Sequence, residues 1–291
     1  MKTWMTRWIA AAVGLLSLAL AEHVAAQSRA PNAAEVCHLD DAAWDAVALV
    51  NAQSIDRLEW APFGTPEWGW DTYLPLMQRE LGTRCAAQSA VFAQRLAAWQ
   101  QRYALPATGV FGPAEFEVLK GVLQERRPFL MARVRGECPE PPPISQLAYL
   151  TVQEEAADRL TRLLRRDTLD AWRRMVATAR AEVPALAGNT EFLQIVSGWR
   201  DPVEDAARCA QDGNCDGLRR AECSAHRTGA AVDLYVGHLT GMGVVSTEPA
   251  SRHFMSHSPA YLWLVSNAHR FGFVPYLYEP WHWEYVGEPA G

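Results

Sequence analysis

The chain has 291 residues, of which 49% are hydrophobic and 21% charged, a composition typical of globular proteins. Its formal net charge is −6, so the basic surface of a nucleic-acid-binding protein is not expected. Beyond the N-terminus, no segment is apolar over the roughly 20 residues that a membrane-spanning helix needs.

The first 26 residues are predicted to be an export signal. Lys2 and Arg7 give a positive start, and the apolar run WIAAAVGLLSLALA precedes small residues and a cleavage site after Ala26. The run is shorter than a membrane span, although an uncleaved anchor remains an alternative. We therefore expect a periplasmic or secreted protein, with no membrane span beyond this signal.

The cysteines predict disulfides, because an even set in an oxidising compartment usually pairs. None has the Cys-x-x-Cys spacing of a thiolate zinc site. Three precede or border the segment 137–145 and three follow it, so at least one bridge joins the two parts if all six pair. A local bridge between Cys209 and Cys215 is also expected. The full set is Cys37, Cys85, Cys138, Cys209, Cys215 and Cys223.

Consecutive prolines in ECPEPPPIS, residues 137–145, predict an extended linker, because proline can neither continue a helix nor donate to a sheet. The linker divides the mature chain into a helical domain, residues 35–136, and a C-terminal domain, residues 146–291.

The first part is predicted to be helical. Apolar residues of SAVFAQRLAAWQQRYAL recur at helical spacing, and a turn at Thr108–Gly109 precedes a second helix beginning at Gly112–Pro113. The order helix, LPATGVFGP, helix within residues 72–125 resembles the small peptidoglycan-binding module of bacterial wall enzymes. The resemblance implies binding to cell-wall glycan, and a generic three-helix domain is the alternative.

The second part mixes helices and strands. TLDAWRRMVATARAEV has a helical apolar face, whereas FLQIVSGWR and WHWEYV are typical of strands. Between them, a helix is predicted with Ser258 as N-cap, Pro259 at its first position and Gly272 as its stop. This irregular alternation predicts an α+β fold, with a small, mainly antiparallel sheet flanked by helices and preceded by the small helical domain.

Two stretches contain candidate zinc ligands, SAHRTGAAVDL and EPWHWEYVG. Imidazole and carboxylate both bind zinc, but His226 and Asp233 are seven residues apart and would face opposite sides of an unbroken strand. A turn or bulge at Gly229 would bring them to one side. Likewise, a turn at Pro280 would bring Glu279 beside His282, which would then begin the strand.

Three ligands leave a tetrahedral zinc ion one position for water, and an unbound carboxylate beside it can accept a proton from that water. Glu279 suits this role. Glu284 is a rival base, because it lies two residues after His282 on the same strand face.

Together, SGWR, SAHRTGAAVDL and NAHRFGFVPYLYEPWHWEYVG, spread over residues 165–287, resemble the VanY-like D-alanyl-D-alanine carboxypeptidases. These are zinc peptidases in the structural group of lysostaphin-type enzymes and the hedgehog signalling domain. The resemblance implies one Zn²⁺ per chain, a general base and acid, a catalytic arginine that also contacts substrate, and a serine that lines the substrate site. The matching residues are His226, Asp233 and His282 for zinc, then Glu279, Arg200 and Ser224.

The expected activity is hydrolysis of D-Ala-D-Ala or related bonds in peptidoglycan stem peptides. A D,D or L,D endopeptidase of the same fold is one alternative. A non-catalytic wall-binding protein with structural zinc is the other. His253 and His257 are four residues apart, but Ser256, Ser258 and Pro259 interrupt a helical metal pair, so no second metal site is predicted there. His238 and His269 are assigned to the surface or to structural roles.

Overall fold

The computed structural model describes residues 35–156, 162–212 and 223–287. The predicted export signal lies outside these ranges. Residues Val36–Gly291 cluster into one compact unit. In the described part of the chain, no helix combines the length and apolar character needed to cross a lipid bilayer.

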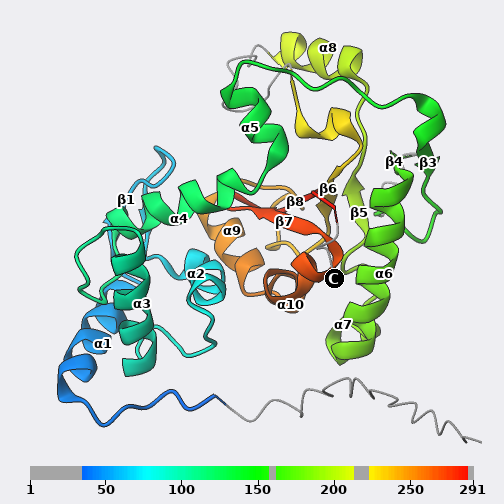
Figure 1. Ribbon diagram of the computed structural model, residues 1–291. Coiled ribbons are helices and arrows are strands. Elements are labelled where there is room, and N and C mark those ends of the chain that lie inside the picture. Colours follow the sequence, from blue (N-terminus) through cyan, green and yellow to red (C-terminus); the bar gives the residue numbers. More distant parts are fainter. Residues whose placement is uncertain (1–34, 157–161, 213–222, 288–291) are drawn as a thin grey trace, which may run out of the picture. The chain divides into compact units, whose positions relative to one another are not determined.

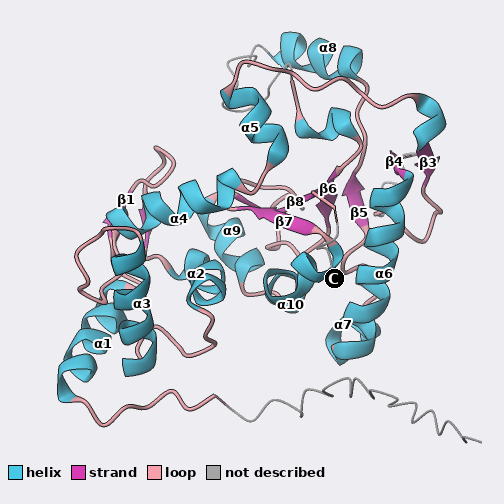
Figure 2. Ribbon diagram, in the orientation of Figure 1, coloured by secondary structure: helices cyan, strands magenta, loops and turns pink. Residues whose placement is uncertain are grey.

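The protein has an α+β fold, as the sequence predicts (Figures 1 and 2). In the N-terminal region, residues 36–136, the elements are α1 (Ala42–Ser54), β1 (Glu59–Trp60), β2 (Glu67–Trp68), η1 (Asp71–Tyr73), α2 (Leu74–Leu81), α3 (Ala90–Arg102), α4 (Pro113–Glu125) and α5 (Pro128–Val134). After it come η2 (Ile144–Gln146), β3 (Leu147–Tyr149), β4 (Leu163–Arg165), α6 (Arg166–Glu182), α7 (Pro184–Gly188), β5 (Ile195–Ser197), α8 (Pro202–Asp212), η3 (Ala225–Thr228), β6 (Ala231–Leu234), α9 (Pro249–Ser256), α10 (Pro259–Asn267), η4 (Ala268–Phe271), β7 (Phe273–Tyr276) and β8 (Glu279–Tyr285).

The helix boundaries follow local capping chemistry. Ser89 caps α3 by accepting a hydrogen bond from the amide of Phe92, and Pro113 begins α4. Ser258 caps α10 in the same way, as predicted. The predicted stop at Gly272 is displaced, because α10 ends at Asn267 and the 3₁₀ helix η4 intervenes before the left-handed Gly272.

A four-stranded antiparallel sheet, in the order β5-β6-β8-β7, carries the candidate site. Helix α9 contacts β8, and α4 from the N-terminal region contacts β7. In Figure 1, β7 and β8 lie among the helices in the middle of the molecule. The central strand β6 is fully buried, so its polar residue Asp233 lies inside the protein.

Residues on both sides of the proline-rich segment share one hydrophobic core. Phe116 and Leu123 of α4 belong to the same buried cluster as Trp281 and Trp283 of β8. Residues 137–143 themselves have no regular secondary structure. The division into a helical domain, a linker and a catalytic domain stays a prediction, and the two flanking parts pack against each other.

Disulfides connect distant parts of the chain. Cys37 pairs with Cys85, and Cys138 pairs with Cys223 across the proline-rich segment. The predicted bridge between the two parts is therefore confirmed. Cys209 is also disulfide-bonded, whereas Cys215, its predicted partner, lies outside the described residues.

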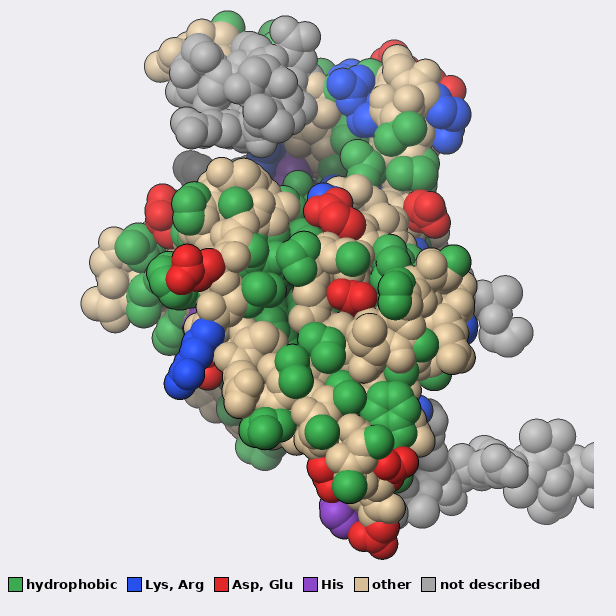
Figure 3. Space-filling model, turned by 90° about the vertical axis from the view of Figure 1, so that its left-hand side faces the viewer, with side chains coloured by type: hydrophobic (Ala, Val, Ile, Leu, Met, Phe, Trp, Pro, Cys, Tyr) green, Lys and Arg blue, Asp and Glu red, His purple; other side chains and the backbone are tan. Residues whose placement is uncertain are grey.

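The surface exposes some large hydrophobic side chains, among them Leu49, Val50 and Trp68 of the N-terminal region. On the face drawn in Figure 3, hydrophobic side chains are dispersed among polar atoms and a few acidic side chains. A mixed surface of this kind is normal for a globular protein and by itself indicates no binding site.

Candidate metal centre

The structure brings together the three predicted zinc ligands. His226 lies in η3, Asp233 in β6 and His282 in β8, and in the register of the sheet Asp233 is directly opposite His282. Their side chains are at most 6% exposed. One nitrogen or oxygen atom from each lies within 4.8 Å of the others, so the three side chains can share one ion. We call this set the buried cluster.

Two backbone irregularities create this convergence. Gly229, after η3, has a φ of +67°, the left-handed turn that the sequence predicts. In the sheet, the adjacent residues Pro275 and Tyr276 pair with Trp283 and Glu279, which are four positions apart in β8. The prediction that His282 begins the strand is therefore wrong, because β8 already begins at Glu279. A register shift between β7 and β8 takes the place of the turn expected at Pro280.

In both imidazoles, one ring nitrogen has an outer hydrogen-bond partner and the other nitrogen faces Asp233. Nδ1 of His226 lies 2.8 Å from the carbonyl oxygen of Gly198, which can only accept, so Nε2 is free and faces Asp233 Oδ1 at 3.3 Å. Nε2 of His282 faces a Glu284 oxygen at 3.3 Å, and its Nδ1 lies 2.9 Å from the same Asp233 oxygen. Metal-bound histidines usually have their outer nitrogen held in this way, so the donor set fits zinc.

The electrostatics of the buried cluster suit a cation. Burial and the charge of Arg200 lower the pKa of His226, which favours the neutral imidazole that a metal requires. Burial alone would raise the pKa of Asp233, but both histidines hold it below its usual range as a carboxylate. His282 has a raised pKa, because its hydrogen bonds to Asp233 and Glu284 outweigh the opposing effect of burial.

Glu279 lies at the open side of the buried cluster. Its Oε2 is 4.0 Å from Nδ1 of His282, and its side chain is 29% exposed, against 6% for His282. Desolvation raises the pKa of this carboxyl above its ordinary value, although nearby positive groups oppose the effect. A carboxylate with a raised pKa is suited to exchanging a proton near neutral pH.

Arg200 lies beside the same aspartate. Its Nη2 is 3.4 Å from Asp233 Oδ2, the carboxylate oxygen not facing the histidines, and it also donates to the hydroxyl of Ser197 at 3.1 Å. One third of its side chain is exposed. The guanidinium therefore has both a fixed position and access to solvent.

Ser224 lies directly before η3. Its hydroxyl oxygen accepts a hydrogen bond from the amide of His226 at 3.2 Å, so it caps the short helix that carries a predicted ligand. Its predicted contact with substrate stays a prediction.

Comparison with known proteins gives a family for this part of the chain. Residues 161–288 match the family model of VanY, D-alanyl-D-alanine carboxypeptidase. The predicted resemblance to VanY-like carboxypeptidases is thereby confirmed for these residues, which we call the VanY region. Among solved structures, the LdcB LD-carboxypeptidase is similar to the chain at 24% identity and a TM-score of 0.37, with 52% of this chain and 71% of that chain covered. None of the curated proteins matches.

The VanY region receives one contact that the sequence analysis did not anticipate. Arg127, immediately before α5 in the N-terminal region, donates to Glu284 from Nε at 2.8 Å and from Nη2 at 2.5 Å. Both side chains are at most 8% exposed. The signal in the sequence was Glu284 itself, an acid on a strand between core aromatic residues, because a buried carboxylate requires a partner.

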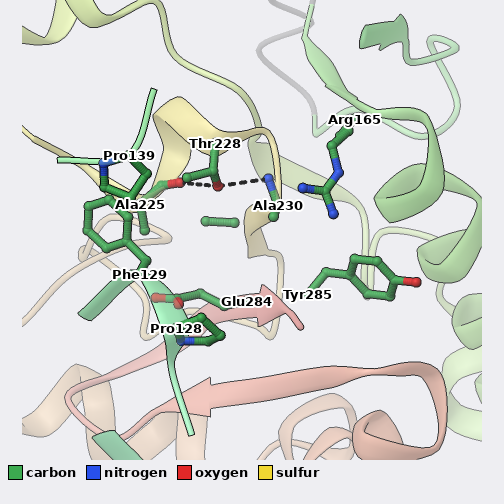
Figure 4. Close-up of a pocket in the computed structure, with 10 residues that line it drawn as sticks. Pro128, Phe129, Pro139, Arg165, Ala225, Thr228, Ala230, Glu284 and Tyr285 are labelled. Atoms are coloured by element: carbon green, nitrogen blue, oxygen red, sulfur yellow. Dashed lines mark hydrogen bonds between the residues drawn. The ribbon is translucent and has the colours of Figure 1, made fainter. Parts of the chain in front are cut away.

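A cavity of about 220 Å³ lies on the Glu284 side of the VanY region (Figure 4). Figure 4 shows Glu284 between Pro128 and Phe129. On the opposite wall, the hydroxyl of Thr228 donates a hydrogen bond to the carbonyl oxygen of Ala225 and accepts one from the amide of Ala230. The cavity is distinct from the predicted catalytic side, since its lining does not include Glu279 or Arg200. The lining residues are Pro128, Phe129, Pro139, Arg165, Ala225, Thr228, Ala230, Ala231, Glu284 and Tyr285.

Proposed function

We propose that the chain is an exported zinc peptidase that hydrolyses the D-Ala-D-Ala bond, or a closely related bond, of peptidoglycan stem peptides. The observation that carries this proposal is the buried cluster, in which two oriented imidazoles and a carboxylate converge beside the solvent-accessible Glu279. The match of residues 161–288 to a carboxypeptidase family supports the reaction class.

In the proposed mechanism, His226, Asp233 and His282 hold the ion. Zinc bound there would polarise a water molecule and the scissile carbonyl. Glu279 accepts the proton of the attacking water and later returns it to the leaving amine. Glu284 is less suited to this step, because its hydrogen bonds to His282 and Arg127 overcome the effect of burial and lower its pKa to about 2.

Arg200 supplies a fixed positive group next to the reacting centre. Its guanidinium can donate two hydrogen bonds to a carboxylate or stabilise the oxyanion of the tetrahedral intermediate. Ser224, beside His226, is proposed to line the substrate site.

The proposed location is the periplasm or the outside of the cell. Residues 1–26 have the pattern of an export signal, and disulfides such as Cys37–Cys85 and Cys138–Cys223 are characteristic of oxidising compartments. Binding of cell-wall glycan by the N-terminal region is part of the same proposal and rests on the sequence of residues 72–125.

The substitution Glu279→Gln tests the proposal. It keeps the size of the side chain and removes its basicity, so we expect release of D-alanine from a pentapeptide to fall by about 10²–10⁴-fold while zinc stays bound. His226→Ala should instead lose turnover together with the zinc ion of the buried cluster. Full activity of Glu279→Gln would exclude Glu279 as the base.

Product analysis decides which bond is cut. Defined muropeptides should yield free D-alanine from a pentapeptide stem, identified by mass spectrometry. Cleavage of cross-linked dimers without release of D-alanine would instead identify an endopeptidase. Intact stems together with zinc bound at the buried cluster would favour the non-catalytic alternative.

A further inference from the structure

A second group of two histidines and one aspartate lies at the surface, between the N-terminal region and the VanY region. Asp71 is the first residue of η1, His253 lies in α9, and His257 follows the end of α9. One donor atom from each lies within 4.8 Å of the others. We call this set the surface cluster.

The donor atoms of the surface cluster point at one carboxylate oxygen. Nε2 of His257 is 2.7 Å from Asp71 Oδ2, and Nε2 of His253 is 3.4 Å from the same oxygen. The two imidazole rings have centroids 4.5 Å apart, so both lie on the same side of the helix end. Three lone-pair-bearing atoms this close require a proton or a metal ion between them.

The orientation of His257 matches that of a metal ligand. Its Nδ1 donates to the carbonyl oxygen of His253 at 2.7 Å, which leaves the lone pair of Nε2 directed at Asp71. Such a backbone acceptor on the outer nitrogen is a regular feature of histidines that bind metals. The break in the helix at this point does not separate the pair, since His257 occupies the position that ends α9.

A neighbouring network holds the two elements together before any ion arrives. Arg252, one residue before His253, donates to Tyr73 Oη at 2.8 Å and to the carbonyl oxygen of Tyr278 at 2.8 Å, and it pairs with Glu67. Arg252 is 1% exposed. Because Tyr73 belongs to the same short helix as Asp71, this network fixes α9 against η1 and preorganises the three donors.

We propose that Asp71, His253 and His257 bind a second divalent transition-metal ion, with zinc as the matching chemistry. Two imidazoles and one carboxylate suit zinc, and because the side chains are 22–53% exposed, water can complete the coordination. The ion joins η1 to α9. Its role is structural, because Glu279 and Arg200 lie at the buried cluster. The proposal exceeds the single zinc ion that the sequence predicts and does not depend on the reaction.

Zinc stoichiometry of the purified protein tests the second site. After treatment with chelator and titration with zinc alone, the unchanged protein should bind two equivalents. His257→Ala should bind one and still release D-alanine, whereas His226→Ala should bind one and release none. The surface substitution His269→Ala is the matched control and should keep both equivalents.

Thermal unfolding provides a readout that does not involve activity. In a His226→Ala background, zinc should raise the Tm, because an ion that binds only the folded state stabilises it. Adding His253→Ala should abolish this rise. Circular dichroism checks that each variant is folded.

The two proposals fail differently. One equivalent in the unchanged protein, retained by His257→Ala and lost by His226→Ala, would overturn the second site and leave the peptidase intact. One equivalent lost by His257→Ala and retained by His226→Ala would support the surface site and contradict the buried one. No zinc-dependent rise of the Tm in the His226→Ala background would also overturn the second site.

Discussion

The buried cluster and the surface cluster each contain two histidines and one aspartate, and they differ in their surroundings. At the buried cluster, His226, Asp233 and His282 are at most 6% exposed. At the surface cluster, the histidines are 43–53% exposed. The buried cluster also has an accessible acid and an arginine at its open side. The comparison indicates that identical donors acquire different roles from burial and from what lies beside them.

The largest expected effect concerns the support of the buried cluster. Arg127→Ala leaves Glu284 buried without its cation, which should lower the free energy of unfolding by about 3–5 kcal/mol. The looser hold on His282 should weaken zinc binding at the buried cluster by about 10–100-fold. Urea unfolding and zinc competition measure both, and the surface cluster should be unaffected.

Matched variants separate packing from positioning. Arg135→Ala breaks an exposed pair with Glu137 and should leave the stability nearly unchanged. The double change Arg127→Met with Glu284→Leu removes both buried charges, so stability should recover while zinc affinity stays weak. Unchanged zinc affinity in that double variant would contradict a positioning role for the pair.

The next effect concerns Arg200. Arg200→Ala should lower kcat/KM by about 10²–10³-fold, the usual result of losing a donor to an oxyanion. A fall in kcat would assign the guanidinium to the oxyanion, whereas a rise in KM confined to peptides with a free C-terminus would assign it to the terminal carboxylate. Arg173→Ala, which breaks a half-exposed pair with Glu154, serves as the control. Equal kinetics in the two variants would exclude Arg200 from the reaction.

A smaller effect is expected at Gly229, whose turn places His226 beside Asp233. Its φ is +67°, and an added Cβ would lie 3.1 Å from the backbone nitrogen of Arg165. Gly229→Ala should therefore cost about 1–2 kcal/mol from the left-handed conformation and also reduce turnover. Gly82→Ala has a similar φ of +64° and open space, so it should lose stability without losing activity. Equal turnover in both variants would show that the turn does not set the ligand geometry.

The smallest effect concerns the pH dependence of stability at the surface cluster when a chelator has removed the metal. The hydrogen bond that His257 donates to Asp71 raises the pKa of His257. Burial would raise the pKa of Asp71, but the two histidines hold it below its ordinary value. The stabilisation from His257 is complete below about pH 6.5 and is lost as the pH rises through its folded pKa, whereas that from Asp71 is present above about pH 4.

Asp71→Asn should accordingly lower the Tm most between about pH 4 and 6.5 when no metal is present, by an amount equivalent to less than about 1 kcal/mol. Nuclear magnetic resonance should show the pKa of His257 falling towards about 6.5 in this variant. With zinc, the difference from the unchanged protein should instead grow as the pH rises, because the ligands must be deprotonated. If the stability difference between Asp71→Asn and the unchanged protein had the same pH profile with and without zinc, Asp71 would not act as a zinc ligand at the surface cluster.

The turn within the buried cluster could be predicted from the sequence, because its information is local, whereas no spacing rule joins it to His282, 49 positions from Asp233. The odd spacing of His226 and Asp233, with Gly229 between them, indicates a turn that reverses the alternation of the strand. Ser258 likewise indicated a helix start, because its side chain caps the residues that follow it.

The remainder depends on contacts between residues far apart in the chain. Arg127 and Glu284 are 157 positions apart, and Asp71 joins His253 and His257 across a similar distance. No spacing rule connects such residues. The bulge opposite Pro275 was also missed, because it follows from the register of two paired strands, whereas the proline at position 280 suggested an ordinary turn.

The buried guanidinium of Arg252 limits which rearrangements of the chain can be tolerated during evolution. It belongs to the half of the chain that includes the VanY region, yet two of its partners, Glu67 and Tyr73, come from the other half. Replacing the N-terminal half by an unrelated module, or expressing residues 146–291 alone, would leave the guanidinium of Arg252 without Glu67 and Tyr73. Substitutions in the two parts of the chain are therefore coupled. Recombination between related genes would give a folded protein only where both parts come from the same parent.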